Sequence, residues 1–336
     1  MGIFINGVGL ISPGYTQENE LIRVEDDRLF CAEPDYSKFI DVKAIRRMSR
    51  IIKMGVTSSM LSLKGSGIDK PDAIIVGTAL GCLEDTVSFL NKLVLNKEEL
   101  LNPTAFIHST HNTISSQIAL NLKCMGYNST YVHRNLSFES ALIDAMLLFD
   151  ESAIGTALVG GIDELCSESY QILKRLGYYT GTDSQLIQAG EGSAFFNLSN
   201  ESSPGSLAEI KAVECVSFAG LDAVEERARK LLQLFNVDSP DLILSGNVNR
   251  DNDSSLLMDL YSNFTSSERV CEFKRFCGEY PTASSFAVHL GADILAKQSI
   301  PKEAGIYLQS ETKLKNILIH NNYKNVHHSL ILLSAC

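Results

Sequence analysis

The sequence predicts a duplicated α/β fold with mixed sheets, and two observations carry this prediction. Residues 126–165 read as a strand, a tight turn, a buried helix and a buried strand. The helix is apolar on nearly every face, which is typical of a central helix. The second half of the chain repeats this order in outline. Residues 241–246 form an apolar run that ends in glycine, as residues 72–77 do, and residues 283–296 form a second buried helix rich in small residues.

In the first half, apolar or β-branched runs that end in glycine, proline or polar residues predict strands, and apolar residues at helical spacing predict helices. We expect strands at 2–11, 72–77, 127–132, 156–162 and 193–198. We expect helices at 41–63, 84–95, 113–122, 137–150 and 167–176, with a loop at 98–104.

The same criteria apply to the second half. They predict strands at 208–219, 241–246, 316–320 and 329–334, and helices at 221–235 and 283–296. Residues 200–206 (NESSPGS) form the most linker-like segment of the chain. We therefore expect one compact unit made of two halves, residues 1–205 and 206–336.

Composition excludes several classes of protein. The formal net charge of −11 over 336 residues argues against non-specific nucleic-acid binding. No apolar run approaches transmembrane length, and the first residues lack the features of a signal peptide. The eight cysteines are scattered, which indicates reduced thiols. We therefore expect a cytoplasmic protein that contacts neither membrane nor nucleic acid.

Two further clusters have alternative interpretations. His108 and His111 lack a third ligand nearby, so we expect turn or capping histidines, no metal site and no cofactor. Arg46, Arg47 and Arg50 lie in the densest positive segment of an acidic protein. They are either a solvated helix face or a docking site for an acidic partner.

Ser137 is the one nucleophile that the turn before the central helix offers. A strand that turns sharply into a buried helix holds the nucleophile in several enzyme classes. A serine nucleophile needs an adjacent base, and nothing in the sequence brings His133 or His289 to Ser137. We therefore interpret Ser137 as an N-cap, followed by Glu139 in the first turn, where a negative charge suits the helix dipole.

The order of these motifs resembles the β-ketoacyl synthases of the thiolase superfamily. The resemblance rests on five stretches: residues 3–14, the basic residues 46–50, TALVGGIDE at 156–164, GEG at 190–192, and Lys274 followed by Gly278. It implies a five-layer αβαβα fold and assembly as a dimer. We expect residues 128–134 to lie at the subunit interface.

The resemblance also implies that the condensing machinery of the family is absent. The position of the family's cysteine falls on Ser137, or on Phe138 if the register slips by one. The positions of its two histidines fall on Ser245 and Glu279, and Lys274 matches its lysine. A glycine pair near the C-terminus is lost at residues 322–324. The three losses together predict that this chain does not catalyse condensation.

Relatives that lack the cysteine are known as chain-length factors, which pair with a catalytic synthase and shape its product tunnel. This sequence looks similar to such subunits of bacterial aryl-polyene or flexirubin-type pigment clusters. The resemblance implies a synthase partner, an acidic acyl carrier protein that docks at Arg46, Arg47 and Arg50, and an acyl-tunnel wall at Phe138.

Two other functions remain open. One is an active acyltransferase or malonyl-carrier decarboxylase that uses Ser137. The other is a self-associating acyl-binding protein, a homodimer with no synthase partner.

Overall fold

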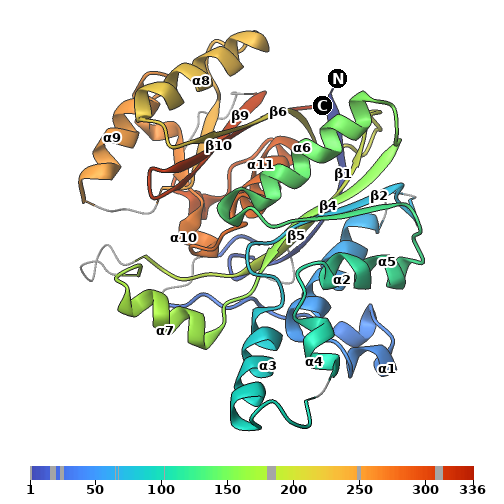
Figure 1. Ribbon diagram of the computed structural model, residues 1–336. Helices are drawn as coiled ribbons and strands as arrows, with labels where there is room; N and C mark the ends of the chain where they lie inside the picture. Colours follow the sequence, from blue (N-terminus) through green and yellow to red (C-terminus); the bar gives the residue numbers. More distant parts are fainter. Residues whose placement is uncertain are drawn as a thin grey trace.

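The computed structural model describes most of the chain (Figure 1). The described residues are 2–15, 20–22, 26–64, 66, 68–101, 103–179, 187–247, 251–306 and 313–336, with backbone alone for 251–255.

The described strands form one mixed sheet in the order β3-β2-β4-β5-β1-β6-β10-β9-β7-β8. Their bounds are β1 Ile3–Ile11, β2 Ala73–Gly77, β3 Tyr127–Tyr131, β4 Thr156–Asp163, β5 Gly192–Ser199, β6 Ala208–Ser217, β7 Leu242–Ser245, β8 Val270–Glu272, β9 Asn316–Tyr323 and β10 His327–Ser334. β1 joins the two halves through a short antiparallel pairing with β6.

The two halves of the sheet have the same topology. In the first half, β2 pairs in parallel with β3 and β4, and β5 is antiparallel to β4 and β1. In the second half, β7 pairs in parallel with β8 and β9, and β10 is antiparallel to β9 and β6. This correspondence agrees with the repeat seen in the sequence.

Helices cover both halves of the sheet and fill the space between them (Figure 1). Their bounds are α1 Val42–Ile45, α2 Arg50–Leu63, α3 Leu83–Leu95, α4 Pro103–His108, α5 Thr113–Leu122, α6 Ser137–Asp150, α7 Ser167–Arg175, α8 Leu221–Leu234, α9 Asp251–Ser262, α10 Lys274–Cys277 and α11 Ser284–Lys297. α2 and α5 cover the first half, α8 and α9 cover the second, and α6 and α11 lie between the halves. The five-layer αβαβα architecture is therefore confirmed.

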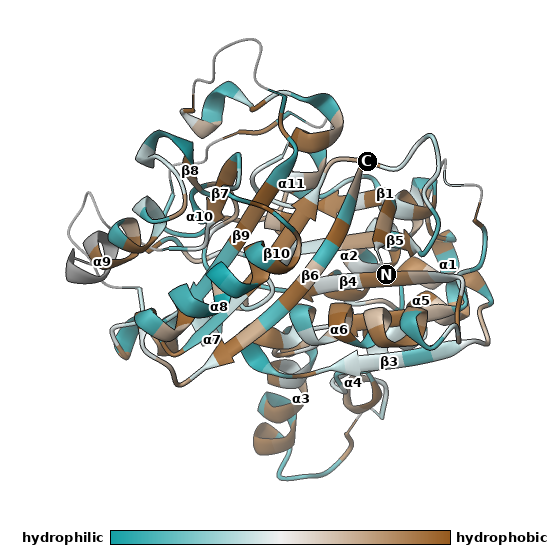
Figure 2. Cartoon of the chain, turned by 90° about the horizontal axis from the view of Figure 1, so that it is seen from above, coloured by the Kyte–Doolittle hydropathy of each residue, from teal (hydrophilic) through white to brown (hydrophobic). Residues whose placement is uncertain are grey.

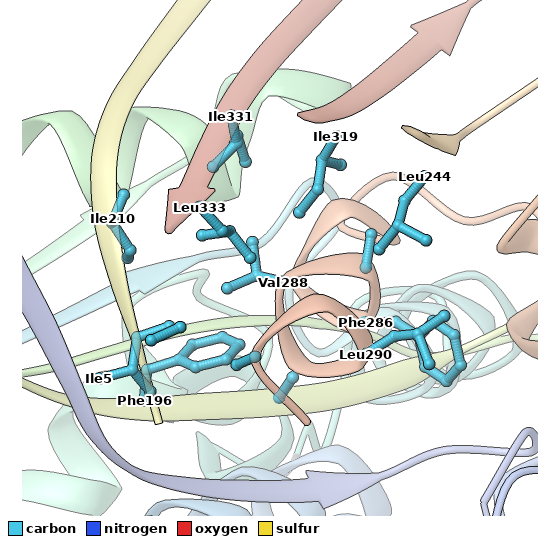
Figure 3. Close-up of a cluster of buried hydrophobic side chains, with 14 of the residues drawn as sticks. Ile5, Phe196, Ile210, Leu244, Phe286, Val288, Leu290, Ile319, Ile331 and Leu333 are labelled. Atoms are coloured by element: carbon cyan, nitrogen blue, oxygen red, sulfur yellow. The ribbon is translucent and has the colours of Figure 1, made fainter. Parts of the chain in front are cut away.

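The middle layer is the main hydrophobic core. Figure 3 shows apolar side chains of α11, among them Phe286 and Leu290, close to side chains from the strands on either side, such as Phe196 and Leu333. Burying one such side chain contributes about 1.5–3 kcal/mol. The outer helix α8 carries mostly hydrophilic residues on its exposed side (Figure 2). Every helix in the described part of the chain is too short or too polar to cross a bilayer.

The expected helix over residues 41–63 is two helices. Asp41 caps α1 by accepting the backbone N–H groups of Lys43 and Ala44. The chain then leaves the helical conformation, and Ser49 is extended before α2 begins. Ile45 at the end of α1 and Met48 within the break both pack onto the outer core, so apolar residues continue at helical spacing across the break. The sequence also missed α4, α9, α10 and β8.

Candidate functional site

A tight turn joins β3 to α6. A 3-10 helix spans Arg134–Leu136, and α6 begins at Ser137. Arg134 has a left-handed φ of 54°, which costs a non-glycine residue about 1–2 kcal/mol. Gly77 at the end of β2 lies so close that a Cβ there would stand 2.5 Å from backbone atoms of Ser137. Only glycine permits this approach, so the turn is held against the end of β2.

The hydroxyl of Ser137 is used inside this turn. Its Oγ donates to the carbonyl oxygen of Arg134 at 2.6 Å and accepts the backbone N–H of His133 at 2.9 Å. The side chain is fully buried. The expected N-cap is therefore wrong, because Ser137 is the first residue of α6 and its hydroxyl closes the preceding turn instead.

The two candidate bases for Ser137 have other surroundings. The Nδ1 of His133 lies 2.8 Å from the hydroxyl oxygen of Ser140. The ring of His289 lies 4.9 Å from that of Tyr15, and burial lowers the pKa of His289 to about 4. Among the described residues, neither ring hydrogen-bonds to Ser137. Without a base, a serine hydroxyl stays protonated and is a weak nucleophile.

Phe138 and Glu139 are also fully buried in the first turn of α6. The ring of Phe138 packs 5.7 Å from that of Phe196 on β5, so an acyl tunnel along this side chain would require the ring to move. Glu139 accepts the hydroxyl of Ser329 on β10 at 2.7 Å, and burial raises its pKa. Glu139 therefore connects the middle layer to the second half of the sheet rather than facing solvent at a helix end.

Ser245, which the sequence resemblance predicts at the first histidine position, begins a chain of buried hydrogen bonds. Its Oγ lies 2.8 Å from the hydroxyl of Tyr261, which lies 2.8 Å from Nδ1 of His320. The Nε2 of His320 lies 3.1 Å from Nδ1 of His328. Burial and the neighbouring His328 lower the pKa of His320 to about 3. The ring is therefore neutral at pH 7 and brings no positive charge toward a developing oxyanion.

Lys274 and Glu279 form a buried ion pair. The two side chains are 2% and 3% exposed, and Nζ lies 2.8 Å from Oε2. Nζ also donates to the backbone carbonyl of Asn322 at 3.1 Å. Condensing chemistry needs a hydrogen-bond donor where negative charge develops. The carboxylate of Glu279 is an acceptor, so it opposes that charge instead of stabilising it.

A cavity of about 250 Å³ brings together two positions at which the sequence resemblance predicts the loss of family residues. It is lined by Leu176, Gly177, Tyr178, Ile187, Asn247, Glu279, Asn322, Tyr323, Lys324 and Asn325. Glu279 is the residue predicted at the second histidine position, and residues 322–324 are those predicted at the glycine pair. The ammonium of Lys324 stands 4.5 Å from the centre of the Tyr178 ring. Bulky and charged side chains therefore occupy this region, where glycines would leave it open.

The three arginines do not form one basic face. Arg50 begins α2, donates to both carboxylate oxygens of Glu191 and pairs with Glu33. Its side chain is 20% exposed, and that of Glu191 is fully buried. Arg46 and Arg47 lie in the break before α2 and are exposed. The expectation of a shared helix face is wrong, and Arg50 has a structural role, because both its partners are carboxylates of this chain.

Two buried carboxylates, Asp163 and Glu191, have roles that the sequence did not reveal. Asp163 is fully buried at the end of β4 and accepts the N–H of Ala79 and the hydroxyl of Thr282, both at 2.9 Å. Burial raises its pKa to about 6. Glu191 accepts the backbone N–H groups of Cys31 and Leu165 in addition to Arg50. In the sequence, Asp163 follows the apolar run at 156–162 and Glu191 follows Gly190. These neighbours were the features that could have indicated buried carboxylates.

The described residues contain no group of three histidine, cysteine, aspartate or glutamate side chains arranged to hold a metal ion.

Comparison with known proteins defines the family. Residues 30–206, more than half of the chain, match the family described as "Beta-ketoacyl synthase, N-terminal domain". The chain belongs to the β-ketoacyl synthase family. No curated protein matches it.

Several solved structures share the fold at low sequence identity. The ishigamide ketosynthase/chain length factor is 18% identical, with a TM-score of 0.81, over 100% of this chain and 99% of that one. AntDE:AntF, a type II polyketide acyl-carrier protein in complex with its ketosynthase, is 14% identical, with a TM-score of 0.75, over 100% of this chain and 99% of that one. A β-ketoacyl synthase from Burkholderia phymatum STM815 is 13% identical, with a TM-score of 0.77, over 100% of this chain and 99% of that one. These similarities confirm the thiolase-like ketosynthase fold.

Proposed function

We propose that this chain is a non-catalytic subunit of the chain-length-factor kind. It pairs with a catalytic β-ketoacyl synthase and acts with an acyl carrier protein in type II fatty-acid or polyketide elongation. The observation that carries the proposal is that the side chains at the predicted catalytic positions are all engaged in interactions within this chain. Ser137 is locked in its turn, Ser245 is bonded to Tyr261, and Glu279 is paired with Lys274.

These substitutions remove chemistry while they preserve the fold. In this proposal the hydroxyl of Ser137 replaces the cysteine thiolate, and the carboxylate of Glu279 replaces the second histidine, which donates a hydrogen bond. Neither new group supplies what condensation needs. The buried ion pair and the buried hydrogen bonds satisfy most of the polar groups that the substitutions bring into the core. A chain that keeps the synthase fold without its chemistry fits a partner subunit.

The heterodimer is supported by the open edge of the sheet. β3 is an edge strand, so one side of its backbone has no strand partner in the described chain. Edge strands pair readily with a strand of another subunit. We therefore place residues 128–134 at an interface that buries more than about 2,000 Å², as obligate pairs do.

The proposal also includes the class of product that the complex makes and the division of the chain into two halves. Resemblance in sequence supports a role in aryl-polyene or flexirubin-type pigment synthesis in the cytoplasm. The matching topology of β1–β5 and β6–β10 supports two halves, residues 1–205 and 206–336.

Co-expression of the full chain with catalytic type II synthases, followed by affinity purification through one subunit, tests the proposal. We expect a stoichiometric complex with one of them. A chain that stays monomeric at micromolar concentration with every synthase would contradict it. Intact mass after incubation with acyl-carrier substrates tests the alternative, since an acyl adduct lost in Ser137→Ala would show catalysis.

A further inference from the structure

A further cavity, of about 240 Å³, opens at the end of β1. Its lining comes from β1 and the turn that follows it, from the segment around the 3-10 helix Tyr36–Lys38, and from α2, which packs against β1. In the sheet order, β1 is the fifth strand counted from β3, so this cavity is separate from the open edge of the sheet. Its described lining contains none of the predicted catalytic positions.

The interior of this cavity is apolar and is formed by the two cores on either side of β1. Leu10 and Tyr15 pack in the middle core, whereas Ile11 and Phe39 pack in the outer core. The ring of Tyr15 lies edge-on to that of His289 on α11, with 4.9 Å between the ring centroids. Buried neighbours therefore fix this wall of the cavity. Preformed apolar cavities with few polar groups are typical of small-molecule sites.

The entrance of the cavity carries one cation without a partner. Asp35 and Lys38 both line the cavity and are both exposed. The carboxylate of Asp35 already accepts the backbone N–H of Ser37 at 3.1 Å and its hydroxyl at 2.6 Å. The ammonium of Lys38 has no ion-pair partner among the described residues. An anionic head group therefore complements this entrance better than a cationic one does.

We propose that this cavity binds a saturated medium-chain fatty acid. The carboxylate lies at Lys38, and the chain lies between Phe39 and Leu61 of α2 on one side and Tyr15 on the other. A methylene group occupies about the volume of a water molecule, roughly 30 Å³, so the cavity holds about eight carbons of the chain. The inference goes beyond the function proposed above, because neither Ser137 nor the β3 edge takes part in it.

Calorimetric titration of the full chain alone with a series of fatty acids from hexanoate to dodecanoate tests this inference. Each added methylene should tighten binding about fourfold, as the burial of one more apolar carbon predicts. The gain should stop near a chain of about nine or ten carbons, when the cavity is full. Nonylammonium, which has the same length of chain with the opposite charge, should bind more weakly than nonanoate.

Two charge reversals provide a matched comparison. Lys38→Glu should weaken the binding of nonanoate about fivefold at low salt, because it replaces an exposed attraction with a repulsion. Lys43→Glu is the control, since Lys43 is also exposed but does not line the cavity. Ala32→Phe places a large side chain at the entrance, where Ala32 is exposed, and should abolish binding. Circular dichroism and Tm check that each variant folds.

Saturable binding of one nonanoate per chain, with this limit in chain length and a loss confined to Lys38→Glu and Ala32→Phe, would support the inference. No binding at millimolar nonanoate, or an affinity that keeps rising through dodecanoate, would overturn it. Equal effects of Lys38→Glu and Lys43→Glu would also overturn it, and this comparison decides the matter if Ala32→Phe does not fold. Because the chain is tested alone, none of these results depends on a synthase partner.

Discussion

Replacing Arg50 should destabilise the protein, whereas replacing Arg46 should not. Arg50 is the cation that compensates the fully buried carboxylate of Glu191. In Arg50→Met, that carboxylate keeps the N–H groups of Cys31 and Leu165 but loses its charge partner. Arg46 is exposed in the break before α2.

The magnitude follows from the burial of the pair. Removing one partner of a buried ion pair costs about 3–5 kcal/mol. The side chain of Arg50 is 20% exposed, so solvent screens part of the interaction and the lower end applies. We expect a loss of about 3 kcal/mol, which corresponds to a fall of roughly 4 °C in Tm for a chain of 336 residues. Arg46→Met should change stability by less than about 0.5 kcal/mol.

Urea denaturation followed by fluorescence and circular dichroism measures both variants. The double variant Arg50→Met with Glu191→Gln distinguishes the cost of leaving a buried charge unpaired from the cost of losing the packing of the arginine side chain. Because it removes the uncompensated charge, it should recover part of the lost stability. Equal stability of Arg50→Met and Arg46→Met would refute the structural role of Arg50. Arg50 would then again be a candidate for docking the carrier protein.

Two further predictions concern pH and the carrier protein. Burial raises the pKa of Glu164 from 4.5 to about 8, so its stabilising proton is fully bound below pH 4.5 and is lost as pH rises through 8. Glu164→Gln should therefore be more stable than the unmodified chain at pH 9, by a few kcal/mol in thermal unfolding, and equal stability there would contradict the raised pKa. In an assembled synthase pair, Arg46→Glu with Arg47→Glu should slow product formation, and more so at low salt, because screening weakens exposed charge contacts beyond about 10 Å at 0.1 M. Unchanged rates with intact pairing would leave these arginines as a solvated surface.

The sequence predicted the layers well because the central elements have strong patterns. The helix at 137–150 has apolar residues at helical spacing, and the strand at 156–162 is almost entirely apolar. The structure buries the strand except at Thr156 and buries one face of the helix, while Leu147 on its other side is 57% exposed. The repeat in the second half was visible for the same reason. The sequence failed at α1 and α2, because apolar residues continue at helical spacing across a break that backbone conformation decides.

The sequence offered positions for the candidate site but could not predict the interactions that the side chains make there. Alignment of motifs placed Ser245, Lys274 and Glu279, and the structure brings the latter two into one ion pair. The partners Tyr261 and His320 come from α9 and β9, distant in sequence from Ser245. Long-range hydrogen bonds depend on how elements pack, which local pattern does not encode. The same holds for Arg50, whose partner Glu191 is 141 residues away.

A reconstitution with malonyl- and acyl-loaded carrier protein tests most directly whether this chain lacks condensing activity. It compares the chain alone, a catalytic synthase that binds it, and the pair, and follows both subunits by intact mass. We expect no adduct on this chain, no condensation by it alone, and extended products only when the synthase and its own nucleophile are present. Condensation by the chain alone, or an acyl group attached at Ser137, would contradict the proposed non-catalytic role.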